Sequence, residues 1–240
     1  MTTTSSPATL SPILSQVIRA RRTAKVLADP TDPLPLTELD RATIDQWVAD
    51  AGWAPFHYPC APVHRRGAEG NGAGAISPAL TSPAPWRMYQ LDGRGCRSLL
   101  AALVDRADAG KIRDMLAAAA AMIVVTWLPD PPADQAATSS DGSDARFAAT
   151  DQNAEHIAAA GAAVQNLLLR ATSDGWQTYW SSGGILRGAE MFQALGINPS
   201  ERALGAIFIF PPDTGPAEVR PGKLREARGK LRDWSRWVEL

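Results

Sequence analysis

The sequence GAAVQNLLLRATSDGWQTYWSSGGILRGAEMFQALGINPSERALGAIFIFPP, residues 161–212, decides the fold of this chain. It continues a helix whose predicted inner face has small and apolar residues three or four positions apart: Ile157, Gly161, Val164, Leu168 and Ala171. Asp174-Gly175 ends this helix, because glycine readily takes a left-handed conformation. The alternation from Trp176 to Trp180 then predicts a short strand, and the apolar run from Ala206 to Phe210 predicts a fully buried strand.

Between these strands lies Ser181-Ser182-Gly183-Gly184, two hydroxyl residues followed by two glycines. Glycine lets a main chain approach a flat ligand closely and point its amides at it. An amphipathic helix and Leu195-Gly196-Ile197 separate this loop from the buried strand. The order of helix, strand, open loop, helix and strand predicts a scaffold that binds a ligand at the loop.

Length and composition favour one domain over residues 1–240, since the chain has 240 residues and 45% apolar content. The 24 basic and 25 acidic residues nearly balance, which argues against an electrostatic binder of nucleic acid or a membrane surface. Cys60 and Cys96 provide neither metal-ligand spacing nor a disulfide framework, and no metal site is expected. The longest apolar run, residues 115–127, is shorter than the roughly 20 residues of a membrane span. We therefore expect a soluble, cytoplasmic protein.

A cluster of cations follows the first predicted helix, whose apolar residues lie at helical spacing from Leu10 to Ile18. The cluster contains Arg21, Arg22, Thr23 and Lys25. Forked guanidinium donors and a hydroxyl group suit a terminal phosphate. The alternative is a helix end whose cations only complement the helix dipole.

The remaining segments predict a second helix from Leu36, with Thr37 as its cap, that ends before Ala54-Pro55-Phe56-His57. Residues 58–84 are rich in Gly, Ala and Pro without an apolar period and predict a flexible insert. The C-terminal extension, residues 213–240, carries the basic residues Lys223, Arg225 and Arg228, and we expect most of it to be solvated and to clasp a partner. Its Trp234 and Trp237 indicate that this end packs on another surface.

The order QNLLL, G-W-x-T-x-W, S-G, L-G-I and an apolar strand ending in proline resembles the C-terminal half of the nitroreductase family, FMN-dependent NAD(P)H oxidoreductases. Arg21-Arg22-Thr23-Ala24-Lys25 is similar to the family's phosphate motif. Ala54-Pro55-Phe56-His57 resembles the Ala-Pro-x-His of a compact subgroup, with Phe56 in place of the usual aspartate. The insert at 58–84 and the strand end Phe-Pro-Pro depart from the family pattern. The resemblance places the insert beside the flavin edge, so we expect it to cover or reshape the substrate side. It also implies that a basic residue of the tail, Lys223, Arg225 or Arg228, could reach the phosphate.

The resemblance implies an α+β fold, a three-layer sandwich with a mixed, mostly antiparallel sheet wrapped by helices. It also implies an intertwined homodimer with FMN at each interface. Arg21, Arg22, Thr23 and Lys25 would hold the phosphate, and His57 would lie near the isoalloxazine ring unless it is only a surface residue. The ring would be lined by Trp180, Ser181, Ser182 and Gly183.

The implied activity is hydride transfer from NAD(P)H through flavin N5 to a small-molecule substrate, a nitroaromatic, quinone or similar conjugated acceptor. No catalytic side chain is expected, because the flavin carries the chemistry. The insert favours an alternative, a specialised flavin enzyme for dehalogenation, ring oxidation or flavin breakdown. Phe56 and the altered strand end favour another, a flavin-binding or interaction protein without turnover.

Overall fold

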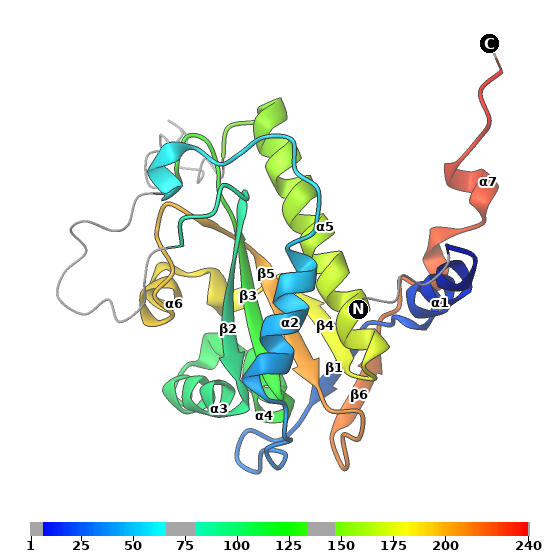
Figure 1. The fold of residues 1–240 in the computed structure, drawn as a ribbon. Coiled ribbons are helices and arrows are strands. Elements are labelled where there is room, and N and C mark those ends of the chain that lie inside the picture. Colours follow the sequence, from blue (N-terminus) through cyan, green and yellow to red (C-terminus); the bar gives the residue numbers. More distant parts are fainter. Residues whose placement is uncertain (1–6, 66–79, 134–146, 240) are drawn as a thin grey trace.

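A computed structural model of the chain describes residues 7–65, 80–133 and 147–239. A four-stranded sheet forms the middle layer of these residues, and helices cover both of its faces (Figure 1). The predicted α+β three-layer sandwich is therefore confirmed.

The strand order in this sheet is β2-β3-β5-β4, and all neighbours are antiparallel. The strands are β2 Trp86–Asp92, β3 Ala121–Trp127, β4 Gln177–Ser181 and β5 Arg202–Phe210. Every residue of β3 is buried, which explains why its sequence is a continuous apolar run without alternation. The two strands predicted around Trp176 and Ala206 are confirmed, although β5 begins four residues before the predicted start.

One face of the sheet is covered by α2 Arg41–Ala51 and α5 Asp151–Ser173. The predicted inner face of α5 was partly wrong, because Ile157 and Gly161 are only half-buried whereas Ala160 and Ala163 are completely buried. The reason is that α5 packs on both α2 and the sheet, so its buried arc is wider than one stripe.

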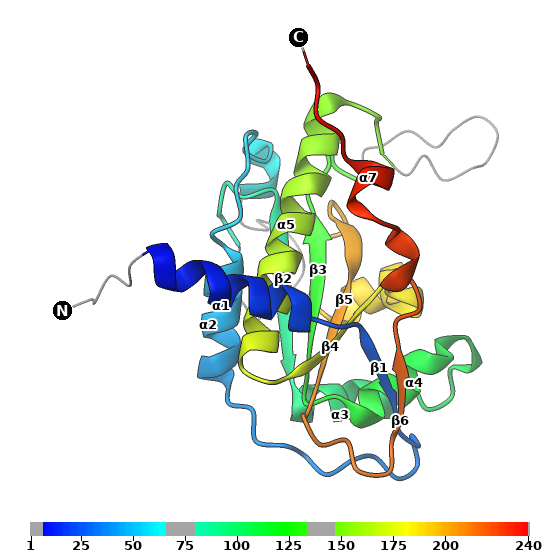
Figure 2. The same ribbon diagram turned by 90° about the vertical axis from the view of Figure 1, so that its right-hand side faces the viewer.

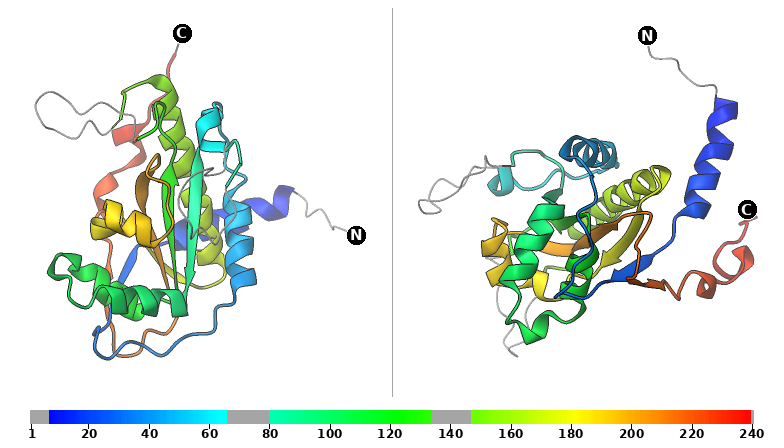
Figure 3. Two further views of the ribbon diagram at one scale, coloured as in Figure 1. Left: turned by 90° about the vertical axis from the view of Figure 1, so that its left-hand side faces the viewer. Right: turned by 90° about the horizontal axis from the view of Figure 1, so that it is seen from below.

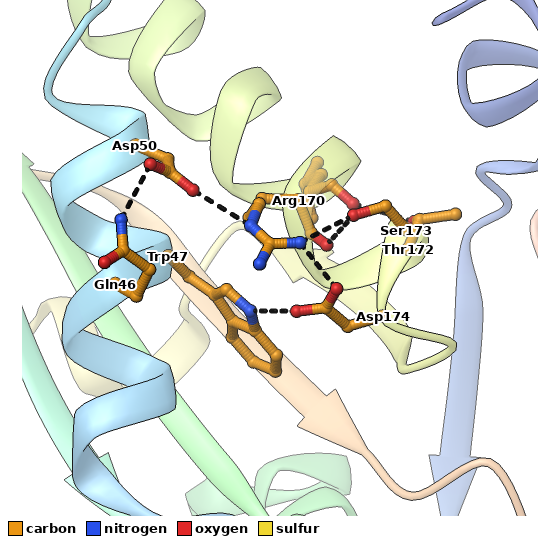
Figure 4. Close-up of polar contacts among 8 residues, drawn as sticks. Gln46, Trp47, Asp50, Arg170, Thr172, Ser173 and Asp174 are labelled. Atoms are coloured by element: carbon orange, nitrogen blue, oxygen red, sulfur yellow. Dashed lines mark hydrogen bonds and ion pairs between the residues drawn. The ribbon is translucent and has the colours of Figure 1, made fainter. Parts of the chain in front are cut away.

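A polar network joins α2 to the end of α5 (Figure 4). The Trp47 indole N–H donates to Asp174 Oδ2 at 2.7 Å, and Trp47 itself is completely buried. Arg170 donates to Asp50 Oδ2 at 2.9 Å and also pairs with Asp174. These contacts fix the angle at which α2 lies against α5.

The opposite face is covered by α3 Gly93–Ala102, α4 Lys111–Ala118 and α6 Ala189–Ala194, with short 3₁₀ turns η2 Ala107–Ala109 and η3 Gly184–Arg187. Asp92 caps the start of α3, since its carboxylate accepts a hydrogen bond from Gly95 N at 2.8 Å. Similarly, α2 is capped by Asp40, which accepts from Thr43 N at 2.6 Å, and not by Thr37. In both helices the acceptor is an ionised carboxylate, whose negative charge is favourable beside the positive N-terminal end of the helix dipole.

A two-stranded antiparallel ribbon lies beside β4 and was not predicted from the sequence. It consists of β1 Ala24–Leu27 and β6 Glu218–Pro221, and Thr23 forms a parallel bridge with Thr178 of β4. Before and after the ribbon, α1 Pro7–Ala20 and the C-terminal segment, with η4 Glu226–Arg228 and α7 Leu231–Trp234, leave the body on the same side (Figure 3, right). Both expose large apolar side chains, including Ile13, Leu14, Ile18, Trp234 and Trp237.

The two ends of the predicted insert are held together by Arg87, whose side chain is 4% exposed. Its guanidinium group donates to the carbonyl oxygens of His64 in η1 Pro62–Arg65 and of Leu80, Ser82 and Ala84. Residues 66–79 of the insert lie outside the described residues, so the predicted flexibility is not described there. None of the described helices is long and apolar enough to cross a membrane.

Candidate functional site

The predicted phosphate cluster forms where α1 ends and β1 begins. Arg21 Nη1 donates to Thr23 Oγ1 at 2.9 Å, and Gly222 N, directly after β6, donates to Thr23 O at 2.8 Å. A Cβ atom at Gly222 would lie 2.8 Å from Thr23 Cβ, so glycine is needed for this approach. The ribbon thus brings the C-terminal extension directly against Thr23.

Arg225 reaches this cluster from the C-terminal extension. Its guanidinium group donates to the backbone carbonyl oxygens of Arg21 and Arg19. Burial and the nearby charge of Arg225 lower the pKa of Arg21. Two guanidinium groups held together in this way are electrostatically unfavourable, and an anion between them would relieve the repulsion.

The other two predicted phosphate residues lie at the edge of this cluster. Arg22 is exposed to solvent. The Lys25 ammonium group lies 4.5 Å from the centre of the Tyr179 ring, a cation–π contact that holds it against β4. The structure therefore brings Arg21, Thr23 and Arg225 together. Lys25 lies two residues after Thr23, on β1.

The conformation of the loop after β4 is set by its two glycines and by a hydrogen bond within the loop. Gly183 has φ 101° and Gly184 φ 51°, both in the left-handed region that glycine adopts without strain. However, Gly183 N donates to Ser181 Oγ at 3.2 Å, so this amide is already engaged and does not point freely at a ligand as the sequence suggested. Ser181 is buried and Ser182 is exposed.

Trp180 lies directly over Gly205 of β5. A Cβ atom at Gly205 would lie 2.5 Å from Trp180 Nε1 and 2.4 Å from Ser181 O. The indole is therefore held closely against the backbone, yet it remains 36% exposed. Sequence reasoning identified Trp180 but missed Gly205, for which a glycine inside an apolar strand was the signal.

The bridge from Thr23 to Thr178 connects the phosphate cluster with the Trp180 surface. Thr178 and Trp180 are two residues apart on β4, so their side chains lie on the same face about 7 Å apart. All predicted residues except His57 consequently lie in the segment that enters β1, on β1 itself, on β4 or in the loop that follows β4.

His57 lies elsewhere in the same chain. It is exposed, and its Nδ1 lies 3.2 Å from Glu155 Oε2 near the start of α5. The cluster lies near Thr178, beside the C-terminal part of this helix (Figure 1), and the 18 residues from Glu155 to Ser173 span about 27 Å. One chain does not bring His57 together with the other predicted residues.

Two cavities in the described part of the chain do not enclose the predicted site. The larger, about 390 Å³, is lined by Arg41, Ile44, Asp45, Gln90, Leu91, Asp92 and Gly95. The second, about 340 Å³, borders Gly184 and lies between Arg106 and Glu190, which form an ion pair.

The model of the nitroreductase family matches residues 18–209, which is more than half of the chain. The chain belongs to the nitroreductase family. The resemblance inferred from QNLLL, G-W-x-T-x-W and the arginine motif is thus confirmed.

Solved structures of family members share its fold. A nitroreductase-like family protein from Bacillus cereus is 23% identical, with a TM-score of 0.59 over 100% of this chain and 99% of that chain. Nitroreductase CinD from Lactococcus lactis, in complex with nicotinic acid, is 13% identical, with a TM-score of 0.59 over 94% and 99% of the two chains. A candidate NAD(P)H:FMN oxidoreductase from Staphylococcus epidermidis is 14% identical, with a TM-score of 0.56 over 94% and 95%. No curated protein matches the chain.

A buried polar group of this nitroreductase-family chain was missed by sequence reasoning. Tyr89 donates to Glu201 Oε1 at 2.8 Å, and the Thr126 hydroxyl donates to the other carboxylate oxygen. Burial raises the pKa of Glu201 above its ordinary value. Glu201 stands in the polar sequence NPSE, which gave no sign that the carboxylate would be buried beneath β2 and β3.

Proposed function

We propose that the chain is an FMN-dependent oxidoreductase that passes a hydride from NAD(P)H to a nitroaromatic, quinone or similar conjugated acceptor. Membership of the nitroreductase family supports this proposal, as does the likeness in fold to the Staphylococcus epidermidis protein described as an NAD(P)H:FMN oxidoreductase.

The observation that carries the proposal is the convergence of Arg21, Thr23 and Arg225. They come from segments about 200 residues apart, and the pairing of β1 with β6 brings them together. A phosphate monoester carries a charge of about −1.5 to −2 at neutral pH. Two guanidinium groups and a hydroxyl fit this charge and its acceptor oxygens, so these residues would hold the FMN phosphate.

The surface formed by Trp180 and the loop Ser181 to Gly183 would hold the ring. FMN held there would supply the redox chemistry, the transfer of a hydride from NAD(P)H to the acceptor. Trp180 is held in place by Gly205 and offers an exposed indole edge to a flat ring. Gly183 and Gly184 allow close approach because they carry no side chain.

We also propose a homodimer with FMN at each interface. His57 lies far from the cluster in its own chain, so the His57 of a second copy would approach the ring. The exposed apolar side chains of α1 and α7 would pack on that copy, among them Ile13, Ile18, Trp234 and Trp237. These two elements project from the body, as an intertwined dimer requires (Figure 1).

A second candidate, a specialised flavin enzyme, is favoured by Arg87. A buried cation that donates to carbonyl groups at both ends of the insert gives residues 58–84 a fixed base, which a loop without a role would not need. Turnover of a generic quinone separates the two candidates, because the specialised enzyme would accept hydride from NADPH without reducing the quinone rapidly.

The first experiment is an absorption spectrum of the purified protein, recorded before and after NADPH is added without oxygen. Flavin bands that bleach support the proposal, and a colourless protein that does not bind added FMN contradicts it. Arg21→Ala should weaken FMN binding by about 2 kcal/mol, the value of a charge-assisted hydrogen bond. Arg94→Ala on α3 is the matched control, and equal affinity in the two variants would contradict the phosphate assignment.

A further inference from the structure

Positive charge is concentrated on one part of the chain. Residues 19–25 and 218–239 contain 11 of the 24 basic residues and four of the 25 acidic residues. Their net charge is +7, which leaves −8 for the rest of the chain. The pairing of β1 with β6 and the contacts of Arg225 bring these two segments together on one side (Figure 2).

Several of these cations have no acidic partner in the part of the chain that the structure describes. The side chains of Arg19, Arg22, Lys223 and Arg228 are exposed, and none forms an ion pair with another described residue. By contrast, Arg41 and Arg106, on other surfaces, are each paired with a carboxylate. The charges of Arg21 and Arg225 already match the charge of one phosphate group. The exposed cations around them therefore exceed what the FMN phosphate needs.

We infer that the protein selects NADPH over NADH, and that Arg19 and Arg228 bind the 2′-phosphate that distinguishes the two coenzymes. This inference rests on the proposed function. The Arg19 carbonyl accepts from Arg225, and Arg228 ends η4, the turn that Arg225 precedes, so both residues flank the phosphate cluster. A guanidinium group binds a phosphate through two parallel hydrogen bonds, and both groups are free to do so.

The test uses FMN-loaded protein and two nucleotides that differ only in the 2′-phosphate, 2′,5′-ADP and 5′-AMP. Isothermal titration calorimetry at low salt should show that 2′,5′-ADP binds at least ~10-fold more tightly. In Arg19→Gln with Arg228→Gln the two affinities should become nearly equal. The ratio of kcat/KM for NADPH over NADH should fall in parallel.

Arg94→Gln is the control for overall charge, because Arg94 is exposed on α3, away from the ribbon. It should keep the preference for 2′,5′-ADP. Equal affinities of the wild-type protein for 2′,5′-ADP and 5′-AMP would overturn the inference. It would also be overturned if the control variant lost as much of the preference for 2′,5′-ADP as the double variant does. Binding of inorganic phosphate as tightly as 2′,5′-ADP would also overturn it, because the site would then be a general anion site.

The FMN content, measured by absorbance before each titration, separates this inference from the proposed function. A protein that takes up no FMN contradicts the proposed function. An FMN-loaded protein that does not distinguish the two nucleotides contradicts only the selection of NADPH.

Discussion

Replacing Gly205 with alanine should destabilise the fold by about 3 kcal/mol, at the upper end of what overpacking costs. The added Cβ would lie 2.4 Å from Ser181 O and 2.5 Å from Trp180 Nε1, where ordinary contacts are 3.4–4 Å. Ser181 pairs with Ala206 at the end of β4, so its carbonyl group cannot move away without disturbing that strand pair. The substitution should therefore also displace Trp180 and the loop after it.

Gly161→Ala is the matched control. A Cβ atom there meets nothing within 4 Å, and Gly161 lies in the interior of α5. Alanine is preferred over glycine in a helix by roughly 0.5–1 kcal/mol, so this variant should be slightly more stable than the wild type. The same chemical change is thus expected to have opposite signs at the two positions.

The assay is urea unfolding of both variants at one protein concentration, followed by circular dichroism, with FMN content measured by absorbance. Gly205→Ala should unfold at lower urea and retain less FMN. A Gly205→Ala protein as stable as the wild type would refute the packing argument. If Gly161→Ala instead lowers stability and shifts the molecule toward a monomer in gel filtration, the open face of α5 is covered by a second copy.

Three further outcomes follow from buried polar groups. Glu201→Gln should change the pH dependence of the free energy of unfolding. Because the pKa of Glu201 is raised in the folded protein, this residue stabilises the wild type most below its unfolded pKa of about 4.3, and the stabilisation is lost as pH rises through the folded pKa. The variant should therefore gain stability relative to the wild type between pH 5 and pH 8. A constant difference across urea titrations at these pH values would contradict this. Trp47→Phe should cost about 2 kcal/mol through loss of the hydrogen bond to Asp174, and Asp174→Asn, which keeps an acceptor, should cost less in the same unfolding assay. Arg87→Met should leave carbonyl groups at both ends of the insert without a donor and make this region cleavable by trypsin or chymotrypsin at lower concentrations, whereas Arg170→Met should not.

Much of the fold could be predicted because its signals are local. The strands at Trp176 and Ala206, the long helix before them and the membership of the family followed from apolar spacing and short motifs. Errors arose where two residues competed for one role, as when Asp40 and not Thr37 capped α2. The buried face of α5 was misplaced because periodicity shows one stripe, while the helix packs against two neighbours.

The candidate site was only half predictable. Arg21 and Thr23 could be proposed from their types and spacing and Trp180 from the family resemblance, and their roles stay predictions, whereas the approach of Arg225 depended on the pairing of β1 with β6. Gly205 acquires its importance only because Trp180 lies on it.

The sequence by itself determined the family, the order of the elements and the residue types that suit a phosphate, because these depend on local pattern and side-chain chemistry. The tertiary structure alone decided which of them meet. It placed Arg225 beside Arg21, buried Glu201 under Tyr89 and Thr126, and separated His57 from the other predicted residues by the length of α5. Such contacts join segments far apart in the chain, and they are set by the packing of whole elements, which no short stretch of sequence encodes.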